Sequence, residues 1–509
     1  MSTSGIARVT TAAAAVAAVV FAPLTAVAAP APSHAIPGLV PDVAAGVTDL
    51  GASTATKTVL IMMKSKDERG LDAFLAAPHQ PLTSAEYAHR FGPSEPAVAR
   101  VTGWATDHGL KSAYQSGSHL VKVTGTADAV GAAFGTTMHD FRGPRGAFTA
   151  ATAAGSLPSA LSADVAAVSG LTASHRLFTA MSPNQPAAPA TAPPDLNKAY
   201  DPPSSATGRG QRVAVIADGL QDETKQDLAT FETLYSLPRV PLTAIYPDGT
   251  PANDADGNPE WALDTEYSTA MAPDVSGVTV YAGLKLEEAE ITSATSRWVD
   301  DDTIKTASMS LGGCESDERS WATALDPVLK KAVAQGQTVF VASGDSGSKC
   351  SNGGPIGVSY PASSPYVIAV GGTELSGNSE TGWSSGGGGK SSFEPVASFE
   401  TSAGGQFDGK SRGLPDVAAA ATNYQIVTGG FPLPGSGTSA SAPVWNGVWA
   451  RALGAKPNLG FAGPHLYAVN RSAFHDITSG SNGDYRAASG WDYVTGLGTP
   501  DIARLINAL

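Results

Sequence analysis

Charged residues are scarce in this chain, and positive ones are the scarcer. Over 509 residues, Asp, Glu, Lys and Arg make up 15% of the sequence, well below the typical share of about 25%. The 32 Lys and Arg are outnumbered by 46 Asp and Glu, and no basic stripe occurs, which argues against nucleic acid as a partner. Because so few positive side chains exist, protonating the carboxylates in acid would leave little positive self-repulsion.

Cysteine is nearly absent, since only Cys314 and Cys350 occur. Two cysteines are too few for a disulfide scaffold, but they could form one bridge outside the cell. Each follows a predicted strand of the same sheet at its carboxyl end, so we expect them to be joined. The alternative is a pair of buried free thiols.

Apolar runs long enough to span a bilayer are also missing after the N-terminus, so no membrane association is expected. Residues 1–29 read as a secretory signal peptide, with Arg8, an Ala/Val-rich core and small residues at 26–28 as a cleavage site. A membrane anchor is the alternative, but the apolar run is short and Pro23 breaks it. We therefore expect a secreted, extracellular protein.

Histidine is absent from the long stretch between His175 and His465. Within that stretch, a Gly-rich turn at Gly435–Thr438 runs into a helix-forming segment from Ser439 to about Ala455. A hydroxyl at a helix N-terminus is near N–H groups and a dipole that favour a developing anion, so Ser439 is a candidate nucleophile. The alternative is that Ser439 only caps a buried helix. If it is a nucleophile, its base is not a histidine.

A pair of acidic residues offers a different base. Glu260 and Asp264 are four residues apart in Glu260-Trp261-Ala262-Leu263-Asp264-Thr265-Glu266, so on a helix their Cβ atoms would lie roughly 5–6 Å apart on one face. Like charges at that spacing repel and raise one pKa. The alternative interpretation is a solvated acidic helix face.

A third candidate, Asp345, lies in Ser343-Gly344-Asp345-Ser346-Gly347, directly after a predicted strand at 338–342. The segment contains the Gly-Asp-Ser-Gly of trypsin-like proteases, but the many disulfides and the upstream His of those β-barrels are missing. An aspartate can donate a hydrogen bond only when protonated, which requires acid or an apolar site.

The chain divides by composition into an N-terminal unit at 30–180, a stiff Pro/Ala-rich linker at 181–203 and a C-terminal domain at 191–509. Short strands and helices alternate in the first unit, which predicts an α+β domain. In the C-terminal domain, continuous apolar strands alternate with helices, which predicts an α/β fold with a parallel sheet covered on both faces. The predicted strands there are 213–216, 278–282, 306–311, 338–342 and 366–370.

These motifs together resemble the sedolisins, or serine-carboxyl peptidases, which have a subtilisin-like fold. The resemblance rests on Gly-Thr-Ser-x-x-x-Pro at 437–443, Glu-x-x-Leu-Asp-x-Glu at 260–266, the Asp345 loop and Ser-Met-Ser-Leu-Gly at 308–312. Segments at 82–94 and 123–135 resemble the activation domain of sedolisin zymogens. A plain binding module is the alternative for that region.

The resemblance implies a Ser-Glu-Asp triad. Ser439 would attack the peptide carbonyl, Glu260 would take its proton and Asp264 would orient Glu260. The Asp345 carboxyl and the Ser439 N–H would stabilise the oxyanion. At pH 4 a histidine base would be neutral in roughly 1 of 300 molecules, whereas a Glu with a pKa of about 4.3 exchanges protons readily, so an acidic working range is expected.

A calcium site near the C-terminus is implied by the same resemblance. Asp476 and Asp492 would provide side chains, and Ile477, Ala488 and Gly490 would provide carbonyl oxygens to one structural Ca²⁺. Ala488 departs from the glycine that is usual in the family. Without the resemblance, an Asx-turn would be the simpler interpretation.

Two departures affect the expected pH optimum. Some family members have a Glu after the first strand and a Trp in the Ser-x-Ser-Trp-Gly loop, whereas this chain has Asp218 and Leu311 there. We expect a monomeric, self-processing endopeptidase that acts on proteins and peptides and is inhibited by its own pro-domain. A tripeptidyl exopeptidase of the same family and an inactive secreted binding protein are the alternatives.

Overall fold

The computed structural model describes most of the chain. The described residues are 1, 33–35, 47–143, 146–171, 177–179, 182–183, 191–351, 353–377 and 379–509. The expected signal peptide apart from Met1, and residues 181 and 184–190 of the expected linker, lie outside them. Residues 33–509 form one compact unit. No helix in the described part of the chain is long and apolar enough to cross a membrane.

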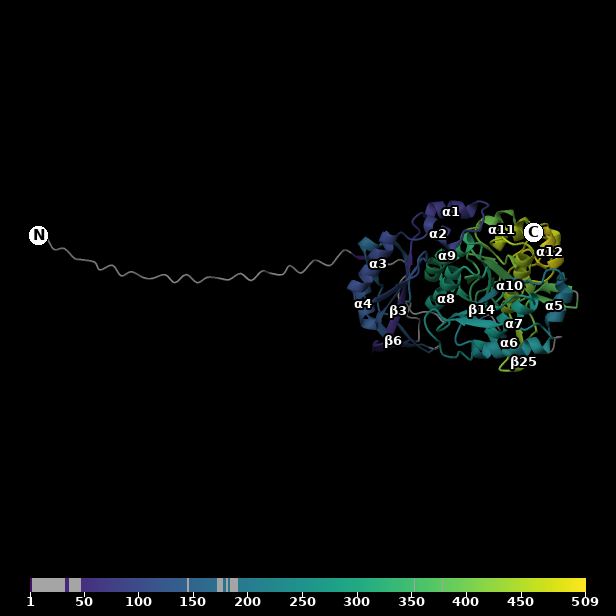
Figure 1. The fold of residues 1–509 in the computed structure, drawn as a ribbon, viewed down its shortest axis with the longest axis horizontal. Coiled ribbons are helices and arrows are strands. Elements are labelled where there is room, and N and C mark those ends of the chain that lie inside the picture. The colour runs from purple at the N-terminus through teal and green to yellow at the C-terminus, as the bar shows by residue number, and fades with distance from the viewer. Residues whose placement is uncertain are drawn as a thin grey trace. The chain divides into compact units, whose positions relative to one another are not determined.

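A four-stranded antiparallel sheet organises the N-terminal part of this unit (Figure 1). Its order is β4 (Lys111–Tyr114), β5 (Leu120–Thr126), β3 (Thr56–Met63) and β9 (Val165–Ser169). The helices are α1 (Glu68–Ala76), α2 (Ser84–Arg90), α3 (Glu95–Asp107) and α4 (Ala127–Phe134). A second antiparallel sheet contains β2 (Thr48–Ala52), β6 (Met138–Gly143) and β7 (Gly146–Ala151). This arrangement is the expected α+β domain.

Both faces of β3 are buried, which explains its unbroken apolar run. Val59 and Ile61 pack in a core with α3 and α4. Leu60 and Met62 point the other way, because successive strand residues alternate between faces. They join the core of the C-terminal domain, through α8 (Glu288–Asp301) and α9 (Arg319–Ala334). The sheet is therefore covered by its own helices on one face and by α8 and α9 on the other.

The C-terminal domain is built on an eight-stranded sheet, as counted in the described residues. Its order is β13 (Leu242–Ile245), β14 (Val278–Gly283), β12 (Val213–Asp218), β15 (Thr306–Met309), β17 (Thr338–Ala342), β19 (Ile368–Ser376) and β20 (Ser379–Gly382), with β23 (Val417–Ala420) also on β19. All pairings are parallel except that of β20. The expected α/β fold is confirmed.

Helices cover the sheet in two groups (Figure 1). One core joins it to α8 and α9, and the other joins it to α7 (Asn258–Met271) and α10 (Thr438–Ala455). α7 and α10 pack directly against each other, and α6 (Asp222–Leu234) packs on α7. The two segments that carry Glu260 and Ser439 are therefore neighbouring helices.

One predicted strand, at 306–311, differs in the structure. β15 ends at Met309, and after Ser310 a new strand, β16 (Leu311–Cys314), leaves the sheet and pairs antiparallel with β18 (Ser359–Tyr360). The apolar pattern runs through both strands, so it gives no sign of this break. The predicted strand at 366–370 likewise begins later, at Ile368, and extends to Ser376.

Candidate active site

Ser439 is the second residue of α10 and is fully buried. The N-cap of this helix is Gly437, with no side-chain cap. Ser439 Oγ makes no hydrogen bond with the described residues that meets ordinary geometric criteria. The hydroxyl therefore does not cap the helix. A buried hydroxyl without a partner is costly, which marks Ser439 as a group retained for another purpose.

Glu260 and Asp264 lie on α7, which confirms that a helix carries the pair, and both are buried. The solvated acidic face considered above is therefore excluded. Asp264 Oδ1 accepts hydrogen bonds from Ser308 Oγ at 2.9 Å and Ser310 Oγ at 2.7 Å. Within the described residues, neither carboxylate oxygen of Glu260 has a hydrogen-bond partner, and Asp264 Oδ2 has none.

Burial changes the acidity of this pair. The pKa of Glu260 is raised well above its usual value by burial and by the neighbouring charges of Asp264 and Asp345, while the Ser439 hydroxyl lowers it. Burial raises the pKa of Asp264 to about 7, against the hydrogen bonds from Ser310 and Ser308. Two adjacent carboxyls with raised pKa values hold protons to higher pH, as expected for a coupled acid–base pair.

Asp345 follows β17 and faces the start of α10. Its Oδ1 accepts hydrogen bonds from Thr438 N at 2.8 Å and Thr438 Oγ1 at 2.9 Å. Its Oδ2 is buried and has no partner among the described residues. Burial raises the pKa of Asp345 to about 7. Oδ1 therefore anchors the Asp345 carboxyl to Thr438, the residue before Ser439. Oδ2 forms no hydrogen bond with the described residues.

The Gly-rich segment 386–389 packs against the loop that carries Asp345. Gly387 N donates to Gly344 O at 2.6 Å, and Ser343 Oγ donates to Gly387 O at 2.7 Å. A Cβ on Gly387 would lie 2.1 Å from Ser343 O. Glycine is required here because the two main chains touch. This glycine segment is therefore buried and closely packed against the Asp345 loop.

Asp218, which stands where some sedolisins have a Glu, ends β12 and is buried. It lies beside the start of α7, because a Cβ on Gly257 would lie 3.2 Å from Asp218 Oδ1. Leu311, which stands where those relatives have a Trp, is also buried. Asp218 is therefore near the helix end that carries Glu260.

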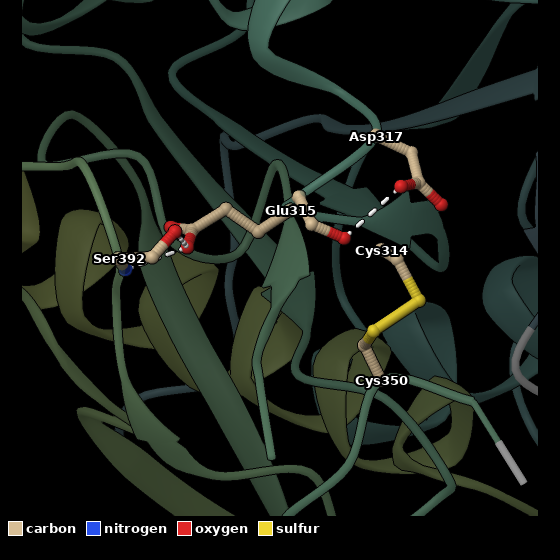
Figure 2. Close-up of a disulfide and its surroundings, with 6 residues drawn as sticks. Cys314, Glu315, Asp317, Cys350 and Ser392 are labelled. Carbon is tan, nitrogen blue, oxygen red and sulfur yellow. Dashed lines mark hydrogen bonds between the residues drawn. A yellow bond between two sulfur atoms is a disulfide. The ribbon is translucent and has the colours of Figure 1, made fainter. Parts of the chain in front are cut away.

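The expected bridge between Cys314 and Cys350 is present (Figure 2). It connects the end of β16 to the segment that follows the Asp345 loop. The next residue, Glu315, accepts hydrogen bonds from Ser392 N and Ser392 Oγ, both at 2.7 Å (Figure 2). The region around β16 is thus fixed covalently and by a buried carboxylate.

The residues expected to bind calcium converge on one loop. Asp492 is buried, and its Oδ2 accepts from Ala488 N at 2.8 Å. The carboxylate of Asp476 accepts from Gly490 N at 3.0 Å. No N–H or O–H of the described residues donates to the carbonyl oxygens of Ile477, Ala488 or Gly490.

Two carboxylates and three carbonyl oxygens are the kind of donors that a hard cation prefers. Asp492 Oδ1 also accepts hydrogen bonds from Val494 N and Thr495 N, both at 2.9 Å, so the Asx-turn considered above is present as well. The described residues contain no group of three or more His, Cys, Asp or Glu side chains able to hold a metal. The proposed site has only two such side chains, and its other ligands would be main-chain carbonyl oxygens, so it does not form a group of this kind.

Sequence reasoning missed three polar residues that complete the site. Ser308 and Ser310 hold Asp264, and Ser310 Oγ also lies 3.3 Å from Ser439 O. Thr438 anchors Asp345. The signal was present, because Ser308 and Ser310 lie two residues apart at the end of β15 and both bond to Asp264, but it served only as a family motif.

Comparison with known families agrees with this site. The activation domain of pro-kumamolisin matches residues 47–174, and the subtilase family matches residues 256–475. Sedolisin from Pseudomonas sp. (strain 101) is 32% identical, over 89% of this chain and 87% of its own. Tripeptidyl-peptidase 1 from Macaca fascicularis is 37% identical, but over only 36% of this chain and 38% of its own.

A solved structure gives the same result. Pseudomonas sedolisin, described as a serine-carboxyl proteinase in complex with two molecules of pseudo-iodotyrostatin, aligns with a TM-score of 0.59 at 33% identity. The alignment covers 63% of this chain and 98% of that one. With its Ser439, Glu260 and Asp264 side by side and an activation domain in front of them, this chain belongs to the sedolisin family of serine-type peptidases.

Proposed function

We propose that the protein is a secreted, acid-acting serine-carboxyl endopeptidase that is made as a self-processing zymogen. The observation that carries this proposal is the group of Ser439, Glu260 and Asp345, which are brought together with side-chain oxygens that are buried and have no hydrogen-bond partner in the described residues. Buried polar atoms in such a group are expected to find their partners in a substrate.

Ser439 Oγ attacks the carbonyl carbon of the scissile bond, and its proton passes to Glu260. Glu260 then gives that proton to the leaving nitrogen as the C–N bond breaks. Water attacks the acyl-enzyme by the same path, leaving a carboxylic acid and free Ser439. Asp264, fixed by Ser308 and Ser310, orients Glu260 throughout.

Asp345 is placed to stabilise the oxyanion. Its pKa of about 7 keeps the carboxyl protonated in acid, so its free Oδ2 can carry the donated hydrogen. The Ser439 N–H at the start of α10 is the second donor. Both requirements, a protonated Asp345 and a shared proton on the Glu260–Asp264 pair, favour an acidic working range.

The N-terminal domain acts as an intramolecular inhibitor in this proposal. It is held on the C-terminal domain by ion pairs and by a buried hydrogen bond from Lys331 Nζ to Gly117 O at 3.0 Å. The ion pairs are Lys122–Asp248 at 2.5 Å and Lys330–Asp72 at 2.8 Å. Loss of such contacts in acid would free the enzyme.

One bound Ca²⁺ is proposed to stabilise the C-terminal loops. Asp476 and Asp492 would supply carboxylate oxygens, and Ile477, Ala488 and Gly490 would supply carbonyl oxygens. The ion would neutralise two negative charges that form no ion pair within the described residues. Chelation near neutral pH should lower the melting temperature of the wild type and not of Asp492→Ala. An unchanged wild-type melting curve would remove the site.

A tripeptidyl exopeptidase is the second candidate, because tripeptidyl-peptidase 1 matches part of the chain. The two activities separate on one long peptide supplied with a free or a blocked N-terminus, incubated with the acid-treated protein. An endopeptidase cuts both forms internally, whereas an exopeptidase releases tripeptides only from the free form. Ser439→Ala should be inactive on both, and equal activity of Ser439→Ala would reject the whole mechanism.

A further inference from the structure

A two-stranded hairpin leads directly into the nucleophile. β24 (Tyr424–Thr428) and β25 (Phe431–Ser436) pair antiparallel, and β25 ends three residues before Ser439. The hairpin packs beside α6 and α7 (Figure 1). Its turn consists of Gly429 and Gly430, which have positive φ values of 59° and 80°, as the type I′ turn of two-residue hairpins requires. The hairpin has no part in the reaction steps described above.

Buried groups of the neighbouring helices hold one edge of the hairpin. Asp227 accepts hydrogen bonds from both turn glycines, at 3.0 and 2.8 Å. Glu266 accepts from Val427 N at 3.1 Å, and Tyr267 Oη donates to Gln425 O at 2.8 Å. All three side chains are buried. The hairpin is therefore fixed in place by groups that the reaction does not use.

These contacts decide which main-chain groups β25 directs outward. On β24, Gln425 O and Val427 N point away from β25, toward the buried side chains just named. Because main-chain groups alternate along a strand, the residue between them points toward β25, where its partner is Leu433. Pro432 and Pro434, on either side of Leu433, therefore direct their main chain outward. Since proline has no N–H, this outer edge offers carbonyl acceptors and no donors.

The outer edge of β25 is also exposed and apolar. Residues 431–434 are all exposed, Phe431 by 71% and Leu433 by 49%, and no strand of the described residues pairs with them on this side. Prolines on an edge strand block unwanted strand pairing, so protection against aggregation is the alternative explanation. It does not account for the two large apolar side chains, because exposed apolar patches promote association.

The chain itself shows how a peptide lies on this strand. β11 (Ser182–Pro183) pairs antiparallel with the end of β25, and its two residues lie opposite Ser436 and Gly435 in that order. From its N-terminal to its C-terminal residue, β11 therefore runs away from Ser439. A substrate that binds in this direction, with its scissile bond at Ser439, would place the residues after that bond along β25. In the same register, its following residues would lie opposite 431–434.

We propose that residues 431–434 form an extended binding site for the amine side of the substrate, which selects polypeptides that are extended and apolar there. This inference rests on the proposed function. Every second substrate residue donates its N–H to the carbonyl oxygen of Pro434 or Pro432, as in strand addition. Phe431 and Leu433 contact the substrate side chains. Unfolded proteins, which expose apolar segments in extended form, are the substrate class that fits this site.

The test uses the acid-treated protein and two long peptides that share the acyl side and the first residues after the cut. One then continues with apolar residues and the other with Ser and Gln, and mass spectrometry verifies that both are cut at the same bond. We expect kcat/KM to be at least about tenfold higher for the apolar peptide, mainly through a lower KM. In the double variant Phe431→Ser/Leu433→Ser, this ratio should fall below about twofold. Leu234→Ser is the matched control, because it removes a leucine of α6 that is 52% exposed, and it should keep the wild-type ratio.

A second measurement needs no variant. N-methylation of successive residues after the cut removes one N–H donor at a time. Because only alternate residues of a paired strand face their partner, kcat/KM should fall about fivefold at every second position and less between them.

Three results would overturn this inference and leave the proposed function intact: equal kcat/KM for the two peptides, a preference that survives in the double variant, or N-methyl losses without alternation. A wild type that hydrolyses neither peptide would instead overturn the proposed function.

Discussion

Two groups of buried carboxyls in the same domain are partnered in opposite ways. In the active site, oxygens of Glu260, Asp264 and Asp345 are buried without hydrogen-bond partners among the described residues. In the second group, Arg412 is fully buried and bonds to both Glu400 and Asp416.

Further donors complete the second group. Tyr467 Oη and Ala369 N each donate to Asp416 at 2.7 Å, and Ala397 N donates to Glu400 at 2.8 Å.

The difference separates structural from chemical use of buried charge. The guanidinium and main-chain donors around Glu400 and Asp416 compensate their desolvation, so these charges hold β19 and β23 in place. In the first group no cation pairs with the carboxyls, and one oxygen of Asp264, one of Asp345 and both of Glu260 form no hydrogen bond with the described residues. Burial raises the pKa of Asp264, Asp345 and also Glu400 to about 7, so the partners of the oxygens, and not the pKa shift, separate the two groups. Leaving buried oxygens without partners costs folding stability. A site that exchanges protons with a substrate needs such oxygens, because they must be free to bond to the substrate.

The largest expected effect is on catalysis, in Glu260→Gln. An amide cannot accept the proton from Ser439, so kcat should fall by about 10⁴-fold or more, as for other members of a catalytic triad. The folded stability should not fall, because a costly buried carboxyl is removed. The measurement is peptide hydrolysis at the optimum pH together with thermal unfolding.

The matched control is Glu266→Gln on the same helix. Glu266 is also buried, but it accepts hydrogen bonds from Val427 N at 3.1 Å, and an amide oxygen can still accept them. Its kcat should stay within about tenfold of the wild type. Comparable losses in both variants would mean that α7 is merely sensitive to substitution and that Glu260 is no base.

The second effect is on stability, in Arg412→Met. Removing the guanidinium leaves Glu400 and Asp416 buried without their cation, which should cost about 3–5 kcal/mol of unfolding free energy. Urea unfolding in a Ser439→Ala background avoids self-digestion. Arg209→Met is the control, because that side chain is 85% exposed beside Asp274 and should cost less than about 1 kcal/mol. Equal losses would contradict the contrast between buried and exposed pairs.

Sequence patterns point more clearly to the groups that we propose to react than to the residues that hold them in place. Ser439, Glu260 and Asp345 are recognisable because each lies in a short local motif. Ser308 and Ser310 also lie in a family motif, but their role could not be inferred from it, because their partner Asp264 is more than forty positions away. The network of Arg412 has no motif at all, since Glu400 lies on a different element and meets Arg412 only in the folded chain.

For the fold, too, the sequence predicted local elements better than contacts between distant segments. The five strands predicted for the C-terminal domain begin within two residues of their expected positions, and α10 begins within one residue of its expected start, because burial patterns are local. The break at Ser310 and the pairings of β10 (Phe178–Thr179) with β16 and of β11 (Ser182–Pro183) with β25 (Phe431–Ser436) depend on main-chain contacts between distant segments. Main-chain hydrogen bonds leave no side-chain pattern, so no sequence signal predicts these pairings.

The third prediction uses Asp345. Asp345→Ala removes an oxyanion donor and should lower kcat by about 10²–10³. Asp345→Asn keeps a donor that needs no proton, so it should retain measurable activity and lose less of it as pH rises through 7. The wild type must lose the proton there, because its pKa is raised to about 7.

The raised pKa of Asp345 also makes the free energy of unfolding depend on pH. A carboxyl whose pKa is raised on folding contributes stability that is fully present below its unfolded value of 3.8 and is lost as pH rises through about 7. Asp345→Asn should therefore unfold with a weaker pH dependence than the wild type between pH 4 and 8. If Asp345→Ala keeps near wild-type kcat at the optimum, Asp345 only anchors the loop.

The smallest expected effect compares the two serines on Asp264. Both donate to Asp264 Oδ1, and both lower its pKa. Either Ser→Ala change should therefore raise the pKa of Asp264, so that the pair with Glu260 keeps its shared proton to higher pH. In a plot of kcat against pH, the alkaline limb should therefore move to higher pH in both variants. Only Ser310 also donates to the Ser439 carbonyl, so Ser310→Ala should additionally lower kcat at the optimum by about fivefold, the value of one neutral hydrogen bond. Tyr467→Phe removes a comparable donor from Asp416 in the second group and should lower stability without moving the profile. A shift of the profile in Tyr467→Phe, or none in the two serine variants, would show that the two groups of carboxyls are not separated in function as their partners suggest.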